Sequence, residues 1–445
     1  MRQEKEHGKP NRGCSSRRGL KKCLSAGTAA LCLLAIATSA GLLAPVARAG
    51  NGAEVLPDGD VRVQGSGVRP QLFFACGGDT NALRSLFADG TVIAELKDLH
   101  AGVGMGTGDL SPARAQVVRR LEQAGVPVVA ALSLPPSQGG YANAGNAPEA
   151  EASFAAFQKW TAAYNLHWTA VGIDIEPNLN DFAATREHPF RFLVTLLGRS
   201  FDGGRVWRAR QAYSALIRQI HSAGYPVQTY QFPFIADERE VHSTVLERLF
   251  GIVDVRPREV ESHGRLATSA SAAAAISSNE NAEVLMIYSS FSHIKAGTAL
   301  VWSYGPEAQG IALGSTESSG DPATDAKFPP LNWNEFSRNL IVASHFSRLI
   351  GVYSLEGCIQ QGFLSRLNTL DWSQSVTISA ASIRRVERFR HVVEGILWTL
   401  SHILYFVAAI FLVVASLIWR RRNRRLRAIP RQSGSSGVDT SLGRT

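Results

Sequence analysis

Short apolar runs recur between residues 71 and 356 and alternate with longer segments whose apolar residues follow a helical spacing. Apolar runs bounded by Gly, Pro or polar residues are typical of strands, and the longer periodic segments are typical of helices. A glycine-rich loop is expected at residues 100–108. Strands are expected at residues 71–76, 92–96, 126–132, 171–176, 227–232, 284–289, 310–314 and 350–356, and helices at residues 81–87, 111–124, 148–166, 206–223 and 334–348.

The apolar runs are continuous rather than alternating, which indicates strands covered on both faces, as in a parallel sheet. Eight such strands alternating with helices predict an α/β protein with a (β/α)8 TIM-type barrel over residues 70–372. A doubly wound open sheet is the alternative. That fold would place a phosphate-binding glycine loop after the first strand, and the sequence Cys76-Gly77-Gly78-Asp79 does not match one.

The segment before the barrel has the pattern of a secretory signal. Residues 24–44 carry no charge, follow two pairs of basic residues, and lead to the small-residue sequence Val46-Ala47-Arg48-Ala49. This pattern predicts a signal peptide over residues 1–49 that is cut after Ala49; an uncleaved signal anchor is the alternative, because the apolar run is long. Residues 50–69 are then expected to form a linker or a peripheral strand pair.

The segment after the barrel predicts a membrane anchor. Residues 373–394 interleave arginines with apolar residues and are expected to form a helical stalk. Residues 395–419 carry no charged residue and are long enough to span a bilayer as a helix. Residues 420–445 begin with six closely spaced arginines, which the positive-inside rule places in the cytoplasm. We therefore expect a single-pass protein of the cytoplasmic (inner) membrane with its barrel on the extracytoplasmic side.

The formal charge of +9 is concentrated at the two ends of the chain. Residues 1–22 carry +6 and residues 420–445 carry +7, which leaves −4 for the part between them. Nucleic-acid binding requires a basic face on the folded domain, so the mildly acidic barrel disfavours a nucleic-acid partner.

Five cysteines occur in the chain, and removal of a signal peptide would leave Cys76 and Cys358. An even number of cysteines in an oxidising compartment is compatible with a disulfide. Cys76 and Cys358 flank the first and last expected strands, which would be neighbours in a closed barrel. A Cys76–Cys358 disulfide is therefore expected, with two buried free thiols as the alternative.

The expected strand Val171–Pro177 carries two carboxylates at its end. Because strand side chains alternate, Asp174 and Glu176 share one face, about 6 to 7 Å apart along the chain, while Ile173 and Ile175 share the other. Two like charges at the end of an apolar strand raise the pKa of at least one of them, which suits a general acid. The alternative is a solvated strand end that caps the following segment.

The active site of this fold lies at the carboxyl ends of the strands. The expected strand ends carry Glu95, Asp98 and Glu317, of which Glu95 and Glu317 are expected to be solvated. They also carry a second group with the expected role of substrate binding. This second group consists of Tyr230, Gln231, Tyr288, Tyr353 and Glu356. The sequence has no His/Cys cluster with metal-ligand spacing and no Gly-x-Ser-x-Gly elbow, so neither a metal nor a cofactor is expected. Carboxylates and aromatic side chains at a barrel mouth are typical of glycoside chemistry.

Three strand motifs give the chain a resemblance to the family 18 glycoside hydrolases, the chitinase-like barrels, and to related TIM-barrel glycoside hydrolases. Residues 172–176 resemble the end of that family's D-G-x-D-x-D-x-E motif on the fourth strand. Met286-Ile287-Tyr288 resembles its M-x-Y motif on the sixth, and residues 352–356 resemble the aromatic-Ser-Leu-acid turn of its eighth. In that family the N-acetyl group of the substrate acts as nucleophile. The resemblance therefore implies that Asp174 orients that amide and that Tyr288 hydrogen-bonds to it.

Two alignments with the fourth-strand motif are open. If Asp174-Ile175-Glu176 corresponds to the terminal D-x-E, Glu176 is the general acid and Asp174 is its helper. If Gly172-Ile173-Asp174 corresponds to the G-x-D, the position of the acid falls on Asn178 and the site is inactive. The first alignment is favoured because Pro177 tends to end the strand directly after Glu176.

The expected function is that of a membrane-anchored extracytoplasmic glycoside hydrolase that acts on an N-acetylated cell-wall or exported polysaccharide. The main alternative is a catalytically inactive barrel that binds carbohydrate or assists the assembly of envelope polysaccharide. A different lyase or hydrolase on the same fold is a further alternative, because a fold does not fix a function.

Overall fold

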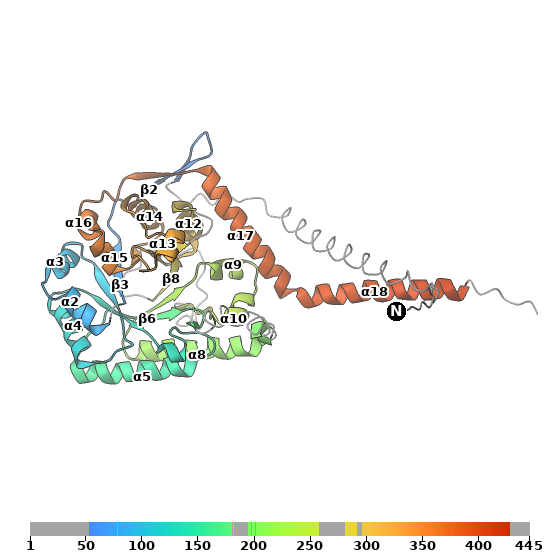
Figure 1. Cartoon of the computed structure of the whole chain (residues 1–445), viewed down its shortest axis with the longest axis horizontal. Helices are drawn as coiled ribbons and strands as arrows, with labels where there is room; N and C mark the ends of the chain where they lie inside the picture. Colours follow the sequence, from blue (N-terminus) through green and yellow to red (C-terminus); the bar gives the residue numbers. More distant parts are fainter. Residues whose placement is uncertain are drawn as a thin grey trace, which may run out of the picture. The chain divides into compact units, whose positions relative to one another are not determined.

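The computed structural model describes residues 53–77, 79–179, 181, 195–196, 198–200, 202–257, 281–291 and 296–427. Eight parallel strands close into a barrel in the order β10-β3-β4-β5-β6-β7-β8-β9, so the expected TIM-type fold is confirmed (Figure 1). The strands are β3 (Gln71–Cys76), β4 (Gly102–Gly106), β5 (Val128–Leu132), β6 (Ala170–Ile175), β7 (Val227–Gln231), β8 (Ala282–Ile287), β9 (Gly310–Gly314) and β10 (Leu349–Tyr353).

The helices that follow these strands surround the barrel (Figure 1). They are α2 (Thr80–Leu86), α3 (Thr91–Asp98), α4 (Pro112–Gln123), α5 (Ala147–Tyr164), α8 (Gly203–Ser222), α9 (Phe234–Glu240), α10 (Val245–Phe250), α12 (Thr298–Tyr304), α13 (Pro322–Lys327), α14 (Trp333–Phe346), α15 (Leu355–Gln360) and α16 (Phe363–Asn368). Short 3-10 turns lie at Pro136–Gln138, Ser289–Phe291 and Gly305–Glu307.

The core has two layers because each barrel strand buries both of its faces. An inner cluster fills the barrel with Phe73, Val129, Ala170, Ala282, Val284, Met286, Ala312 and Leu349, and Tyr230, Phe232 and Tyr288 pack against it. The larger outer cluster lies between the strands and the helices and includes Ile173, Ile175 and Val227. Successive residues of one strand therefore belong to different layers, which fixes the direction of every side chain at the barrel mouth.

The second strand differs from the sequence-based expectation. Residues 92–96 lie in helix α3, and the strand is β4, which falls inside the expected glycine-rich loop at 100–108. The glycines of β4 make room inside the barrel: a Cβ on Gly102 would lie 2.3 Å from Cε1 of Phe73. The bulky ring of Phe73 on β3 thus replaces a side chain that β4 would otherwise supply.

A small antiparallel sheet joins the two ends of the barrel segment. Strand β2 (Val61–Gln64) pairs on one side with β1 (Ala53–Val55) and on the other with β11 (Ser375–Ile378). Residues 53–64 thus form strands within the range expected to be a linker or strand pair. Residues 375–378, expected to belong to a helical stalk, form a strand, and helix α17 (Ala380–Ser401) begins after it.

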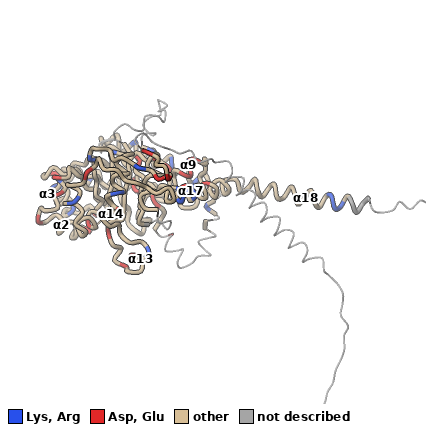
Figure 2. Tube along the Cα trace, turned by 90° about the horizontal axis from the view of Figure 1, so that it is seen from above, with Lys and Arg blue, Asp and Glu red and all other residues tan. Residues whose placement is uncertain are grey.

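Helix α18 (Ile403–Arg427) follows α17, and the structure divides into one unit that ends at Leu397 and another that begins at Trp398. Within the described residues, Ile403–Asn423 is the one helical segment long and apolar enough to cross a membrane, with a mean hydropathy of 2.3. Figure 2 shows α18 without charged residues until the arginines near its end. The expected span at 395–419 therefore overlaps the end of α17 and most of α18. The expected signal segment at 1–49 and most of the basic tail lie outside the described residues.

Candidate active site

Strand β6 carries the two carboxylates of the site. The chain enters β6 after α5 ends at Asn165, whose left-handed backbone (φ 48°) reverses its direction. The N–H of Thr169 then donates to the carbonyl oxygen of Val128 (2.9 Å), which fixes the register of β6 against β5. In this register Asp174 stands opposite Tyr230 of β7. Asp174 and Tyr230 therefore share the inner face of the barrel.

A glycine below Asp174 opens the interior on the same face of β6. A Cβ on Gly172 would lie 3.1 Å from Cε2 of Tyr230, so the absence of a side chain at residue 172 accommodates the tyrosine ring. Ile173 and Ile175 belong to the outer core layer, as the alternation expected from the sequence requires. Asp174 and Glu176 are half-buried, so both carboxyl groups lie on the side of the barrel mouth.

The two carboxyl groups have raised and unequal pKa values. Burial raises the pKa of Asp174 to about 6. Burial, and then the negative charge of Asp174, raise the pKa of Glu176 to about 8. Among the described residues, no group donates a hydrogen bond to either carboxyl, so neither charge is compensated. Glu176 therefore keeps its proton to a higher pH than Asp174 does.

Three of the expected tyrosines lie around this pair. Burial, and then the charge of Asp174, raise the pKa of Tyr230 and Tyr288. Burial, and then the charges of Glu317, Glu356, Glu176 and Asp174, raise the pKa of Tyr353. The rings of Tyr288 and Tyr353 are 5.9 Å apart between centroids and tilted by 32°. The Tyr230 hydroxyl donates to Oε1 of Gln228 (2.9 Å) within the barrel. The expected aromatic wall is thus assembled from β7, β8 and β10.

Gln231 points away from the site, in contrast to its expected role in substrate binding. It follows Tyr230 in β7 and therefore lies on the outer face, where its Nε2 donates to the carbonyl oxygen of Val255 (2.9 Å). Thr229 Oγ1 donates to the same oxygen (3.2 Å). The alternation of β7 would have given this direction, because only one of residues 230 and 231 can face the interior.

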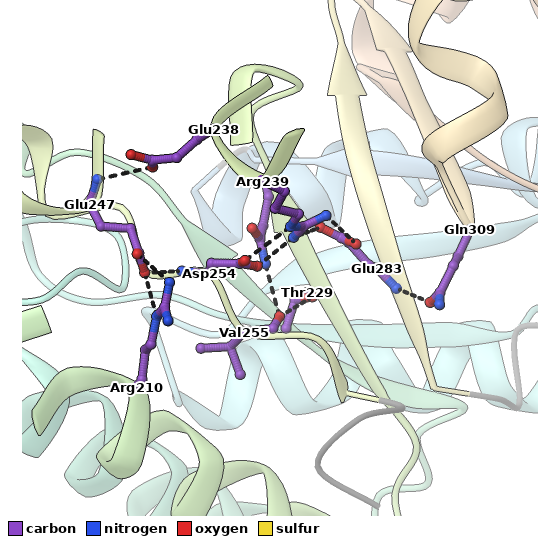
Figure 3. A network of polar contacts seen from close by, with 10 residues as sticks. Arg210, Thr229, Glu238, Arg239, Glu247, Asp254, Val255, Glu283 and Gln309 are labelled. Atoms are coloured by element: carbon purple, nitrogen blue, oxygen red, sulfur yellow. Dashed lines mark hydrogen bonds and ion pairs between the residues drawn. The ribbon is translucent and has the colours of Figure 1, made fainter. Parts of the chain in front are cut away.

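A buried ion network backs β7 and β8 on their outer side (Figure 3). Arg239 of α9 donates to Asp254 (2.5 and 3.0 Å) and to Glu283 at the start of β8 (2.5 and 3.0 Å). Glu247 pairs with Arg210 of α8, and its Oε1 accepts from the backbone N–H of Asp254 (2.8 Å). These acids hold helices α8, α9 and α10 against the barrel. Their role is therefore structural.

Two further acids in α9 are also occupied by structural partners. Asp237 accepts from Nε of Arg390 (2.6 Å) and from the Tyr304 hydroxyl (2.6 Å). Glu238 accepts from the backbone N–H of Leu246 (2.8 Å). Burial raises the pKa of Asp237 to about 6 and that of Glu238 to about 7. Their raised pKa values come from burial inside the helical layer.

Glu356 lies in the first turn of α15, directly after β10, and its charge raises the pKa of the Tyr353 hydroxyl. Glu317 lies nearby, where it accepts from Ser354 Oγ (2.5 Å). Glu95 and Asp98, expected at a strand end, instead belong to helix α3. The site therefore has an acidic border on the side of β10.

Cys76 and Cys358 are both buried and both free, so the expected disulfide is not formed in the structure. The Cys358 Sγ donates to Thr316 Oγ1 at 3.6 Å. Burial raises the pKa of the Cys358 thiol to about 12 and raises that of Cys76 further. The structure thus has the alternative arrangement, in which two neutral thiols fill the space between β3 and α15.

Tyr141 is a member of the site that sequence reasoning missed. It lies in the loop between β5 and α5, and burial, followed by the charges of Glu176 and Asp174, raises the pKa of its hydroxyl. The loop pairs with the end of β6 through a bridge between Ala142 and Ile175. No periodicity in the loop sequence reveals this pairing, because only the tertiary structure brings the loop beside β6.

The fold and the site define a TIM-type barrel with two uncompensated carboxyl groups and a set of tyrosines at the carboxyl ends of its strands. Among the described residues, no group of three or more His, Cys, Asp or Glu side chains could hold a metal ion.

Comparison with known proteins finds solved structures of low similarity. No family model and no curated protein matches the chain. Its structural neighbours include a GH18 chitinase from Pseudoalteromonas aurantia, with 10% sequence identity, a TM-score of 0.36 and coverage of 67% of this chain and 99% of the chitinase. They also include the xylanase and alpha-amylase inhibitor protein from Scadoxus multiflorus, with 11% identity, a TM-score of 0.34 and coverage of 67% and 98%.

A D-allulose 3-epimerase from Methylomonas sp. is a further neighbour, with 9% identity, a TM-score of 0.33 and coverage of 72% of this chain and 98% of the epimerase. The neighbours thus combine a hydrolase, an inhibitor and an isomerase. At these scores the similarities carry no argument about activity, and the function has to be argued from the site.

Proposed function

We propose that the protein is a glycoside hydrolase in which Glu176 is the general acid and Asp174 is its anionic partner. The observation that carries the proposal is that both carboxyl groups lie at the carboxyl end of β6, at the mouth of the barrel. Burial there raises the pKa of Asp174 to about 6, and burial and the charge of Asp174 raise the pKa of Glu176 to about 8. A general acid must be protonated at the working pH, and a neighbouring carboxylate must be ionised to stabilise positive charge at the sugar. Pairs whose environments separate their pKa values in this way mark acid and base roles.

The positions of the side chains support the assignment of Glu176 over Asn178. Glu176 directly follows β6, and its charge raises the pKa of Tyr141, Tyr288 and Tyr353. Asn178 lies beyond the buried Pro177, with its Nδ2 beside Gly139. The carboxyl of Glu176 is therefore the group that the tyrosines surround.

The tyrosines and carboxylates of the site indicate the class of substrate. Tyrosine rings pack on sugar faces, and carboxylates accept hydrogen bonds from hydroxyls. If the substrate carries an N-acetyl group, Asp174 would orient its amide and Tyr288 would hydrogen-bond to it. The apolar segment Ile403–Asn423 would anchor the barrel in a membrane, which fits a substrate in the cell wall or an exported polysaccharide.

The proposal is tested by measuring cleavage of labelled peptidoglycan fragments, N-acetylglucosamine oligomers and exopolysaccharide oligomers by the full-length protein. With a substrate that the wild type cleaves, Glu176→Gln should lower kcat by about 10² to 10⁴ and leave binding intact. Asn178→Ala is the matched control and should retain most activity. Full activity of Glu176→Gln would refute the assignment. Glycan binding without turnover by the wild type would instead favour a carbohydrate-binding barrel.

A further inference from the structure

The loop of residues 133–146 extends the inner face of the barrel beyond the end of β6. The N–H of Ala142 donates to the carbonyl oxygen of Asp174 (3.0 Å), and the N–H of Glu176 donates to that of Ala142 (3.1 Å). These two bonds make residue 142 a parallel partner of Ile175. The loop therefore acts as a short additional strand at the point where both carboxyl groups emerge.

The alternation of this short strand gives the direction of Tyr141. Ala142 is buried in the outer core layer together with Ile175. Because consecutive residues of extended backbone point to opposite faces, Tyr141 points to the inner face, which it shares with Asp174 and Glu176. The influence of both carboxylates on the Tyr141 hydroxyl agrees with this direction.

Buried hydrogen bonds hold the loop in place. Nδ2 of Asn146 donates to the carbonyl oxygens of Tyr141 (2.8 Å) and Gln138 (2.9 Å). Oδ1 of Asn146 accepts from the N–H of Asn143 (2.8 Å) and from the Tyr213 hydroxyl of α8 (3.1 Å). Asn146 and Tyr213 are only 4% and 1% exposed. A buried and fully bonded network of this kind keeps the loop rigid, so Tyr141 is positioned before any ligand arrives.

Two of the four tyrosines keep their hydroxyls available for a ligand. Within the described residues, neither Tyr141 nor Tyr353 forms a hydrogen bond through its hydroxyl, whereas Tyr230 donates to Gln228. Tyr141 is half-buried and Tyr353 is 41% exposed, so both rings reach the solvent at the barrel mouth. Tyr353 ends β10 and Tyr141 lies beside the end of β6, so both belong to the mouth of the barrel. After burial, the charges of Glu176, Asp174 and Tyr353 contribute to the raised pKa of Tyr141.

We propose that Tyr141 and Tyr353 form a sugar-binding subsite over the carboxylate pair, with Tyr141 as a substrate-contacting residue supplied by the rigid loop. The two rings offer apolar faces for the sugar ring, and the two hydroxyls donate to or accept from its hydroxyl groups. This subsite rests on the proposed glycoside hydrolase function, because it takes the same substrate class.

The test is calorimetric titration of the full-length protein, solubilised in detergent, with N-acetylglucosamine oligomers. Tyr141→Ala should weaken binding about tenfold or more, because it removes both the ring face and the hydroxyl. Tyr141→Phe keeps the ring and should weaken binding about three- to tenfold through loss of the hydrogen bond. Tyr164→Phe is the matched control. Tyr164 is a half-buried tyrosine at the C-terminal end of α5, hence at the opposite end of the barrel, and its change should leave binding unaltered.

The outcomes separate the subsite from the function. Wild-type binding with unchanged affinity in both Tyr141 variants would overturn the subsite and leave the function standing. Absence of wild-type binding to every oligomer would overturn both. If Tyr141→Ala does not fold, Tyr141→Phe alone decides, because it alters one hydroxyl that has no hydrogen-bond partner among the described residues.

The rigid loop gives a second readout. Asn146→Ala removes the bonds that hold Tyr141 and should weaken oligomer binding as Tyr141→Ala does, while Asn332→Ala, at the N-cap of α14 away from the loop, should not. Equal affinity of Asn146→Ala and the wild type would contradict the positioning of Tyr141 by the loop.

Discussion

Arg390 of helix α17 and Asp237 of helix α9 form an almost fully buried ion pair, with Nε 2.6 Å from Oδ1. The guanidinium also lies 4.2 Å from the centroid of the Tyr304 ring and donates to Glu307 (2.8 Å) and to the carbonyl oxygen of Ser303 (2.7 Å). The Arg390 guanidinium therefore fixes helix α17 to the barrel, through contacts with α9, with α12 and with the turn that follows α12.

The first prediction concerns this pair. Arg390→Ala should destabilise the protein by about 3 to 5 kcal/mol, because it leaves Asp237 buried without its cation. Arg388→Ala is the control on the same helix. The Arg388 side chain is exposed, and within the described residues it donates only to the Arg384 carbonyl oxygen, so the change should cost about 0.5 kcal/mol or less. Thermal unfolding of the two variants measures both effects, and equal melting temperatures would contradict the role of Arg390.

The second prediction concerns stability and pH at Glu176. The folded state raises the pKa of this carboxyl from its ordinary value of 4.5 to about 8, so between these pH values the folded protein holds more protons than the unfolded chain. Stability from this group is therefore full below about pH 4.5 and is lost as pH rises to 8. Glu176→Gln does not titrate and should be more stable than the wild type at pH 8 to 9, by about 1 kcal/mol or more, but not at pH 4. A constant difference in melting temperature across this range would contradict the raised pKa.

The third prediction concerns the pH–rate profile. Asp174→Asn removes the charge that contributes to the raised pKa of Glu176, so the pKa of Glu176 should fall. The alkaline limb of the profile, where the general acid loses its proton, should then move to lower pH, and kcat should also fall. Asp98→Asn, on helix α3, serves as the control and should leave the limb in place. An alkaline limb that does not move in Asp174→Asn would separate Asp174 from the acid.

The fourth prediction concerns the cysteines. Both thiols are buried and their pKa values are raised, so little thiolate exists at neutral pH. Iodoacetamide should leave Cys76 and Cys358 unmodified in the folded protein and should label both after denaturation without reductant. Peptide mass spectrometry gives the result. A cross-linked pair of peptides in exported protein would restore the disulfide that the cysteine count suggested.

The fifth prediction concerns membrane topology. The arginines from Arg420 onward should retain that end in the cytoplasm, and the barrel should lie outside. A reporter that is active only outside the cytoplasm should work when joined after Leu397, where α17 is nearly complete, and should fail when joined after Gln432. The opposite pattern would reverse the orientation.

The sequence was sufficient to predict the barrel because six strands have strong apolar runs and a seventh, at residues 310–314, has a weaker one. The second strand was misassigned because Gly102–Gly106 carries only two apolar side chains, while residues 92–96 combine a strand-like composition with a helical position. The reason is a long-range contact: Phe73 fills the space in front of Gly102. A single sequence does not show that a large side chain on one strand fills the space left by a glycine on the next strand.

The residues of the candidate site also divide into those that local sequence patterns predicted and those that depend on tertiary contacts. Asp174 and Glu176 followed from alternation within a single strand, whereas Tyr230 followed from its position at a strand end; the structure places Asp174 and Tyr230 on the inner face. Gln231 was expected at the site because it lies at a strand end, but alternation within β7 places it on the outer face. The position of Tyr141 depends on a hydrogen-bonded contact between a loop and β6, and no local sequence pattern predicts this contact.

The sheet formed by β1, β2 and β11 determines where the chain can be cut. A fragment that ends at residue 372, the expected limit of the barrel, would lack β11 and α17. Strand β2 would then expose an unpaired edge next to the solvent, and exposed edges of this kind favour association between chains. The same fragment would leave Asp237 without Arg390. We therefore expect a well-behaved fragment to include β11 and the part of α17 that carries Arg390, and we expect a shorter fragment to aggregate.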